Sequence, residues 1–591
     1  MDVGETKADW PARAWGLALL GAAIGLGIHL LTDKAGGYGM TDDPLRLAAA
    51  TFLGVAGLSF AVVLERVRIG WSAAFALVAG LVIAAVIYWN GGPGRWEADD
   101  GWRLFCAVLA VGIAGPLFQT IRDGALEAGK GRGLRALPYP AVHDHGWTNV
   151  VLVLLALVFV GVVWLLAWLL ASLFNLIGID LLQELLRKDW FGWMMSGAAM
   201  GAAIGLLRDH DRVVAMLQRV AMLVLSVLAP VLGAGLLIFL IATLFTGLEP
   251  LWAATRDTTP ILLSACAGAL ILANAVIGDS PEDEARSRPL RWGALALAFA
   301  ILPLAAIATV STGLRVGQYG LTPARLWALT FIAFACAVGL AYWVALARRR
   351  LAWATPARPA NIALAIGLCA VMLLLSTPIV SFGALSARSQ VARLEAGRVS
   401  PERFDWAALR YDFGPAGKAA VERLAKSGTP AIRTAAARTL DEKDRWALAQ
   451  RTRDVDAKAA FAGRVTVLPE KAPLPDALVD AILREGGGCG RNDDRGRCIV
   501  RHVDGSGEAV VLSWRAGCEA CAIDAAYFVR GADGKWEAAA ERWPVPPPPA
   551  EARKAQAAAE RAAAERGEIE VRQVTRRQVF VGGRPVGTVF E

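Results

Sequence analysis

Ionisable side chains are almost missing from the centres of the long apolar runs in this 591-residue sequence. Charged residues make up 19% of the chain, whereas hydrophobic residues make up 55%. Proton and ion relays inside a membrane usually need buried Asp, Glu, His or Arg. Their scarcity argues against an ion-coupled transporter, and it leaves a flippase or a passive path open.

Histidine is also rare, with five copies, and no catalytic constellation can be recognised around it. Three of the five lie in two short acidic clusters, HDH at 143–145 and DHD at 209–211. Imidazole and carboxylate can together bind zinc or iron, so a joint metal site is conceivable if the two loops meet. Solvated charges beside the membrane are the favoured interpretation, and we expect no metal and no other cofactor.

Neither a strong charge bias nor a basic stripe is present. The net charge of +8 is modest and is spread over the connecting segments, which argues against nucleic acid as a partner. Asp99 and Asp100 are the remaining carboxylates that a membrane enzyme could use, and we regard an enzyme as the less favoured class. The 21 tryptophans fit a membrane protein, because indole rings favour the membrane interface.

Long apolar runs dominate what is present. About 20 apolar residues in a helix cross the roughly 30 Å of bilayer hydrocarbon. The first run follows Asp2, Glu5 and Asp9, so we interpret it as a retained helix rather than as a signal peptide. The eleven predicted spans are 13–32, 47–64, 70–89, 102–120, 149–173, 191–207, 221–245, 259–278, 291–311, 325–347 and 361–383.

The connecting segments predict the orientation of these spans. Lys and Arg alternate between two sets of segments, and the set that includes the N-terminus carries twice as many as the other. The positive-inside rule places the richer set in the cytoplasm. With an odd number of spans, residues 384–591 are then expected outside, in the periplasm of a bacterium.

Four cysteines near the C-terminus, Cys489, Cys498, Cys518 and Cys521, have the spacing C-x8-C-x19-C-x2-C. An oxidising compartment favours structural disulfides, for which three pairings are open. A four-thiolate zinc site or a redox-active C-x2-C pair stays open as an alternative. The other four cysteines lie in apolar runs and are interpreted as packing residues.

Small residues at helical spacing predict a close helix contact. Gly197, Gly201 and Gly205 are four residues apart, so they share one helix face that another backbone can approach closely. Gly21 and Gly25 repeat the pattern in the first span. Packing within the chain is favoured over a dimerisation face.

The segment RVGQYGLTPAR at 315–325 predicts a tight turn between two spans. Gly320 permits the turn, and Thr322 can cap a helix that Pro323 opens. Arg315, Tyr319 and Arg325 could contact a phosphate or carboxylate headgroup, because arginine offers a bidentate fork of donors. Snorkelling of the arginines and anchoring at the interface is the favoured interpretation.

Two further features concern the membrane region. Residues 176–190 place leucines on one helix face and polar residues on the other. This pattern is typical of an amphipathic helix that lies on the outer membrane surface. Asn274 is the clearest polar residue inside a span, and we expect it to make an interhelical hydrogen bond rather than to bind a ligand.

The C-terminal third reads as a soluble α+β region. A helical segment is predicted over 384–460 and a cysteine-containing, β-rich module over 461–543. Residues 544–591 contain a proline-rich linker, a helix of about 550–566 and a terminal hairpin around Gly582-Gly583. The predicted fold is therefore an all-α polytopic membrane domain, residues 1–383, with an extracytoplasmic α+β domain.

Three segments together resemble a bacterial family of multipass inner-membrane proteins known as domain of unknown function 4153 (DUF4153). They are 315–325, 141–149 (AVHDHGWTN) and 393–425 (RLEAGRVSPERFDWAALRYDFGPAGKAAVERLA). The resemblance covers about residues 10–425. It implies an inner-membrane location and brings no catalytic residues, because the family's role is unassigned.

These observations favour an integral inner-membrane protein with a structural, sensory or assembly role in the envelope. The lipid bilayer and an envelope protein or cell-wall component are the expected partners, and the oligomeric state is open. The alternative is a transporter or flippase for a lipid-linked or amphipathic substrate.

Overall fold

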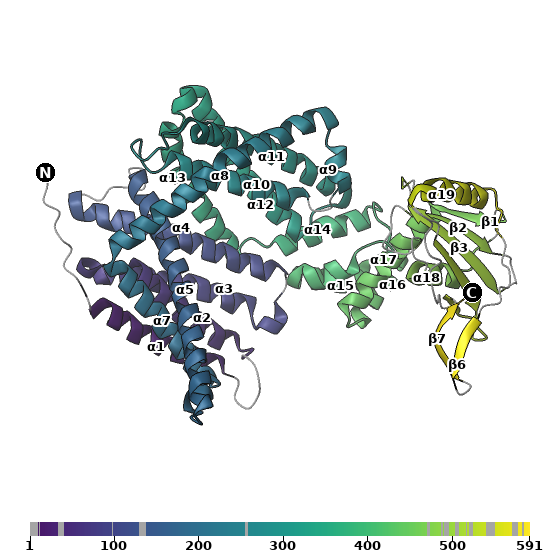
Figure 1. The fold of residues 1–591 in the computed structure, drawn as a ribbon, viewed down its shortest axis with the longest axis horizontal. Coiled ribbons are helices and arrows are strands. Elements are labelled where there is room, and N and C mark those ends of the chain that lie inside the picture. The colour runs from purple at the N-terminus through teal and green to yellow at the C-terminus, as the bar shows by residue number, and fades with distance from the viewer. Residues whose placement is uncertain are drawn as a thin grey trace. The chain divides into compact units, whose positions relative to one another are not determined.

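The structure is a computed structural model, and it describes most of the chain (Figure 1). The described residues are 10, 12–33, 41–96, 98–128, 137–254, 258–469, 473–485, 489, 496–502, 507–515, 517–518, 524–538, 550–569, 577–581 and 584–590. The chain divides into two compact units. One contains residues 1–393 and 409–420, and the other contains residues 394–408 and 421–591.

Eleven helices in the described part of the first unit are long and apolar enough to cross a membrane, as the sequence predicts. They are α1 (Ala12–Thr32), α2 (Pro44–Val63), α3 (Ile69–Asn90), α4 (Ala98–Ala128), α5 (Tyr139–Leu176), α7 (Asp189–Asp209), α8 (Asp211–Thr246), α10 (Thr258–Ile277), α11 (Arg288–Tyr319), α12 (Pro323–Arg349) and α13 (Ala354–Ser376). Two short helices, α6 (Leu181–Leu186) and α9 (Glu249–Ala254), lie in the connections.

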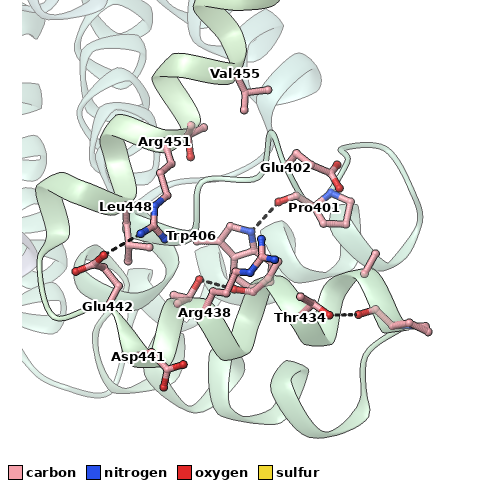
Figure 2. Close-up of a pocket in the computed structure, with 15 residues that line it drawn as sticks. Pro401, Glu402, Trp406, Thr434, Arg438, Asp441, Glu442, Leu448, Arg451 and Val455 are labelled. Carbon is pink, nitrogen blue, oxygen red and sulfur yellow. Dashed lines mark hydrogen bonds and ion pairs between the residues drawn. The ribbon is translucent and has the colours of Figure 1, made fainter. Parts of the chain in front are cut away.

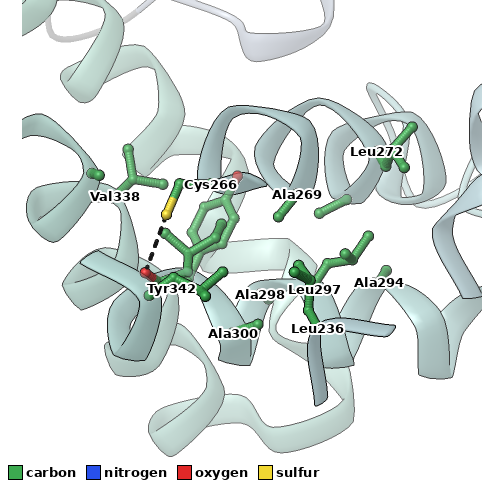
Figure 3. Close-up of a cluster of buried hydrophobic side chains, with 14 of the residues drawn as sticks. Leu236, Cys266, Ala269, Leu272, Ala294, Leu297, Ala298, Ala300, Val338 and Tyr342 are labelled. Atoms are coloured by element: carbon green, nitrogen blue, oxygen red, sulfur yellow. Dashed lines mark hydrogen bonds between the residues drawn. The ribbon is translucent and has the colours of Figure 1, made fainter. Parts of the chain in front are cut away.

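Helix α11 is the centre of the largest buried core. It packs against α8, α10 and α12, and small side chains along it, such as Ala298 and Ala305, are fully buried. Figure 3 shows Leu297 of α11 among residues of α8, α10 and α12, including Leu236 and Tyr342. A second core joins α1 with α2, α5 and α7. These two cores are thus built mainly from small and branched apolar residues.

The end of the last span differs from the prediction. Helix α13 ends at Ser376, whereas the apolar run suggested a span to residue 383. Thr377 has an extended backbone because the proline that follows disfavours the helical conformation at the preceding residue. A separate helix, α14 (Phe382–Glu395), then begins at Phe382.

The predicted amphipathic helix over 176–190 is also shorter than expected. Helix α5 continues to Leu176. Gly178 follows with a φ of +81°, a left-handed conformation that glycine adopts readily and that commonly ends helices. What remains is the six-residue helix α6, with Leu186 buried and Leu181 exposed.

Three helices follow α14, and the first of them crosses the boundary between the two units. Helices α15 (Gly414–Ser427), α16 (Pro430–Asp441) and α17 (Arg445–Ala462) follow one another with short turns. Thr429 precedes Pro430 at the start of α16, and the Asp444 side chain caps α17 by accepting the Trp446 N–H.

A five-stranded mixed sheet follows, in the order β1-β2-β3-β4-β5. Strand β1 (Val465–Leu468) runs parallel to β2 (Gly496–His502), and the other pairs, with β3 (Glu508–Arg515), β4 (Asp524–Arg530) and β5 (Trp536–Ala538), are antiparallel. Val500 of β2, Val511 of β3 and Phe528 of β4 are buried. Side chains that alternate along each strand point to opposite faces of a sheet, so a sheet with one covered face buries every second residue.

Helix α18 (Asp476–Glu485) contributes to the core of this sheet, and sequence reasoning did not predict it. Leu478, Ala481 and Ile482 recur at helical spacing and are fully buried in that core. Farther along, α19 (Ala550–Glu565) confirms the predicted helix, and β6 (Arg577–Val581) pairs with β7 (Arg584–Phe590) as the predicted hairpin. Gly582 and Gly583 lie outside the described residues.

Candidate functional site

The turn between α11 and α12 is built as its residues predict. Gly320 ends α11 with a φ of +75°, and its N–H donates to the carbonyl of Val316 at 2.8 Å. Thr322 caps α12 by accepting the Arg325 N–H, and Pro323 is the first residue of the helix. These three residues hold the two spans in a fixed geometry at the turn.

Helix α14 docks onto this turn. The side-chain amide of Gln390 donates to the carbonyls of Tyr319 and Leu321, each at 2.8 Å. The Ser389 hydroxyl accepts the N–H of Leu321 at 3.2 Å. A Cβ on Gly320 would lie 2.6 Å from Cδ of Arg393, so the glycine is needed for close approach as well as for its φ.

Three guanidinium groups gather there, which we call the arginine cluster (Arg315, Arg325 and Arg393). Arg325 donates to the carbonyl of Gly320 at 2.6 Å and lies over the Tyr319 ring, 5.5 Å from its centroid. Arg393 donates to the carbonyls of Gly317 and Gln318. Arg315 and Arg393 both repel Arg325 electrostatically.

The arginine cluster carries unbalanced positive charge. Within the described part of the chain, none of its three members has a carboxylate within ion-pairing distance. Each guanidinium has five N–H donors, and the carbonyl contacts use only some of them. The arrangement can therefore attract and hold an anion such as a phosphate, although part of its role is to bind the end of α11.

The carboxylates at Asp99 and Asp100, the residues weighed for a membrane enzyme, have structural partners. Asp99 accepts the Trp327 indole N–H at 2.9 Å and the backbone N–H of Gly383. Asp100 forms an ion pair with Arg103 at 3.2 Å. The contacts of Asp99 connect the start of α4 to the starts of α12 and α14. The two carboxylates are thus engaged in structural contacts and are not arranged with each other as a general acid and base.

The HDH and DHD clusters each find separate partners. His145 contacts Asp123 at 3.3 Å, and Asp144 accepts a hydrogen bond from Gln218 at 3.5 Å. Asp209 forms an ion pair of 2.6 Å with Arg13. Among the described residues, no group of three or more His, Cys, Asp or Glu is placed to hold a metal ion.

Asn274 lies in a hydrogen-bond network that joins four helices. Its side chain donates to Tyr342 Oη at 2.9 Å and accepts from Tyr139 Oη at 3.2 Å and from Asn361 Nδ2 at 2.6 Å. Tyr342 Oη also donates to Asn361 Oδ1 at 3.0 Å. The predicted interhelical hydrogen bond is present. The four side chains of the network use most of their hydrogen-bonding groups on one another.

Gly197, Gly201 and Gly205 lie against α1. A Cβ on Gly201 would overlap the carbonyl oxygen of Leu17, and one on Gly205 would lie 2.5 Å from Cα of Ala14. A Cβ on Gly197 would overlap the carbonyl of Gly21. The small-residue faces of α1 and α7 therefore meet within one chain.

The C-terminal cysteines include a buried disulfide. Cys489 and Cys498 are bonded, with Cα atoms 5.7 Å apart and both residues at most 1% exposed. Cys518 is also disulfide-bonded, and Cys521 lies outside the described residues. In this form Cys489 and Cys498 cannot serve as thiolate ligands of zinc.

The second unit contains a cavity of about 960 Å³, and sequence reasoning did not predict it (Figure 2). Loop residues Pro401, Glu402 and Trp406 form one wall, and residues of α16 and α17 form the others. The Trp406 indole donates to the carbonyl of Pro401 at 2.8 Å, and Arg451 pairs with Glu442 at 3.1 Å. We call this hollow the helical cavity.

The helical cavity has the mixed lining of a binding site. It combines the apolar surfaces of Leu448 and Val455 with charged groups of both signs, including Arg438. Its volume fits a peptide segment or a small molecule. No local pattern in the sequence indicates it, because the loop wall precedes the helical walls by about 25 to 55 residues.

Comparison with known proteins gives one match. The model of the family described as domain of unknown function (DUF4153) matches residues 45–424. No curated protein and no solved structure matches the chain. The matched residues include all but the first of the membrane helices, the arginine cluster and the loop that lines the helical cavity.

Proposed function

The chain belongs to the DUF4153 family and is a multipass membrane protein, and from this premise we propose that it acts in the bacterial envelope. The protein resides in the cytoplasmic membrane with its N-terminus in the cytoplasm. Its C-terminal unit lies outside and binds an envelope protein or a cell-wall component. The role is structural, sensory or assembly-related rather than enzymatic.

The disulfide between Cys489 and Cys498 is the observation that carries this proposal. It lies in the apolar core beneath the sheet, next to Val500 and Leu478. Disulfides persist in oxidising compartments and are rare in the bacterial cytoplasm. The excess of Lys and Arg in the alternate connecting segments supports the same orientation independently.

The helical cavity is the proposed partner site. It belongs to a unit whose described residues include no candidate membrane span, so we expect it to be open to extracytoplasmic ligands. The indole of Trp406 offers a large apolar contact, and Arg438 offers a cation without an ion-pair partner in the described part of the chain. A peptide or glycopeptide with apolar and anionic groups fits this lining.

A matched pair of substitutions on α16 tests the assignment. Thr434 lines the helical cavity, whereas Ala437 is exposed on the same helix and does not line it. Thr434→Trp should fill part of the hollow and fail to restore growth under detergent stress in a strain that lacks the gene. Ala437→Trp should restore it. Equal complementation by the two variants, at equal thermal stability, would contradict the cavity assignment.

A second candidate is transport or flipping of a lipid-linked or amphipathic substrate. The arginine cluster favours it, because three guanidinium groups with no carboxylate partner among the described residues can select an anionic headgroup. Reconstituted protein should then move a fluorescent anionic lipid across vesicles, and Arg315→Ala with Arg325→Ala should slow it. Vesicles without any movement would remove this candidate and leave the envelope role standing.

A further inference from the structure

Two hollows adjoin one another where α8, α11 and the end of α12 meet. The smaller, of about 340 Å³, includes Glu284, Arg288 and Arg291 in an otherwise apolar lining, and the larger, of about 720 Å³, is almost wholly apolar. Trp292, Leu295 and Leu351 line both, so the two hollows are neighbours on the same surface, and we call them together the lipid cleft. A cleft with a charged end and an apolar end has the polarity of a phospholipid.

The apolar end lies between helices. It is lined by Ala234 and Leu237 of α8, Ala296 and Phe299 of α11, and Leu346 of α12. Gly293 draws α11 against α8, since a Cβ there would lie 2.6 Å from the backbone nitrogen of Pro230. Phe299 and Trp292 are 44% and 63% exposed, so their surfaces are free to contact a hydrocarbon chain.

The charged end carries more positive charge than its carboxylate can balance. Glu284 is shared by Arg291, at 3.3 Å, and Arg358, at 3.5 Å. Arg288 lines the smaller hollow and Arg350 the larger. Within the described residues neither has an ion-pair partner. Two guanidinium groups are thus available beside an interfacial tryptophan.

We propose that this cleft binds one anionic phospholipid. Arg288 and Arg350 contact the phosphate, Trp292 lies at the level of the headgroup, and an acyl chain occupies the apolar end. Both arginines belong to the connecting segments predicted to face the cytoplasm, where anionic lipids attract basic groups beside membrane helices. A soluble phosphate would match the arginines but would leave the apolar end empty.

Lipid binding to the full-length protein tests the proposal. The delipidated protein in a nonionic detergent receives phosphatidylglycerol or phosphatidylcholine with identical oleoyl chains, and native mass spectrometry measures the bound fraction. Arg288→Gln with Arg350→Gln should weaken phosphatidylglycerol binding by about five-fold per arginine. Ala234→Trp should weaken binding of both lipids, because it fills the apolar end without changing any charge.

The control removes the same number of charges at the end of α12. Arg348→Gln with Arg349→Gln should leave binding within about two-fold of the wild type, because these residues do not line the cleft. Equal effects of the two double variants would overturn the proposal. So would equal binding of the two lipids, or displacement of the lipid by an equal concentration of glycerol phosphate. The arginine cluster and the helical cavity are untouched by these variants, so failure here leaves the proposed function intact.

Discussion

Buried polar side chains in this protein hold membrane helices together. Asn274, Tyr342 and Asn361 lie on three helices and satisfy one another, with Tyr139 of α5 as a fourth member. In a membrane the unfolded reference state also finds hydrogen-bond partners, so each such bond stabilises by only about 0.6–2 kcal/mol. The geometry is that of a helix junction, and it offers no open coordination position to a ligand.

Tyr342→Phe should lower the thermal stability of the purified protein. The hydroxyl of Tyr342, a fully buried residue, makes two hydrogen bonds, and its loss leaves Asn274 and Asn361 short of a partner. We expect a loss of about 1–3 kcal/mol, measured by unfolding in detergent. Tyr319→Phe is the control, because that ring is 61% exposed. An unchanged midpoint for Tyr342→Phe would contradict the network.

The turn between α10 and α11 predicts a pH dependence. A hydrogen bond with Asp279 raises the pKa of Asp283, assisted by desolvation and by the charge of Asp279, while Arg219 and His143 oppose the shift. A carboxyl whose pKa is raised on folding stabilises the protein below its ordinary pKa. That contribution disappears as the pH rises through the raised value.

Asp283→Asn should therefore raise the unfolding midpoint at neutral pH, where the two carboxylates repel. The gain should shrink as the pH falls toward the ordinary range of aspartate. Melting curves from pH 4 to pH 8 measure it, with Glu282→Gln, an exposed neighbour in the same turn, as the control. A gain that is constant over this range would contradict the raised pKa of Asp283.

At the scale of elements, the contact between α1 and α7 depends on backbone approach. Gly201→Ala should destabilise the protein by about 1–3 kcal/mol, because its Cβ would overlap the carbonyl of Leu17. Gly235→Ala on α8 has open space and should be neutral or slightly stabilising. Equal unfolding midpoints for the two variants would contradict the close approach of α1 and α7 that the structure shows.

Hydropathy predicted the membrane helices well because each span must be apolar along its whole length, whatever its neighbours. It failed at the end of α13, since the residues before Phe382 are apolar although Pro378 prevents the helix from continuing. Helix α18 was missed because it lies between strands and spans only ten residues. Periodicity at Leu478, Ala481 and Ile482 was the available signal.

The candidate sites were predictable only in part. Arg315, Tyr319 and Arg325 lie within one short segment, so their proximity follows from the chain itself. Arg393 joins them from α14, about 70 residues away, and no local pattern indicates that. The helical cavity and the lipid cleft depend on packing between separate helices, which composition and spacing do not specify.

At the scale of the whole molecule, the described residues include a membrane unit with eleven candidate spans and a second unit with a sheet and a disulfide. An odd number of spans puts the two ends of the membrane unit on opposite sides. The charge pattern of the connecting segments and the disulfide then favour the same assignment by unrelated physical arguments. The proposed envelope role depends on that assignment.

The redox state of the buried cysteines in cells tests the assignment most directly. Cells expressing the full chain are quenched in acid and denatured, free thiols are alkylated before and after reduction, and peptide mass spectrometry locates the label. We predict that Cys489 and Cys498 are alkylated only after reduction, as expected of a unit in an oxidising compartment. Alkylation of both cysteines without reductant would place the C-terminal unit in the cytoplasm and contradict the proposed envelope role.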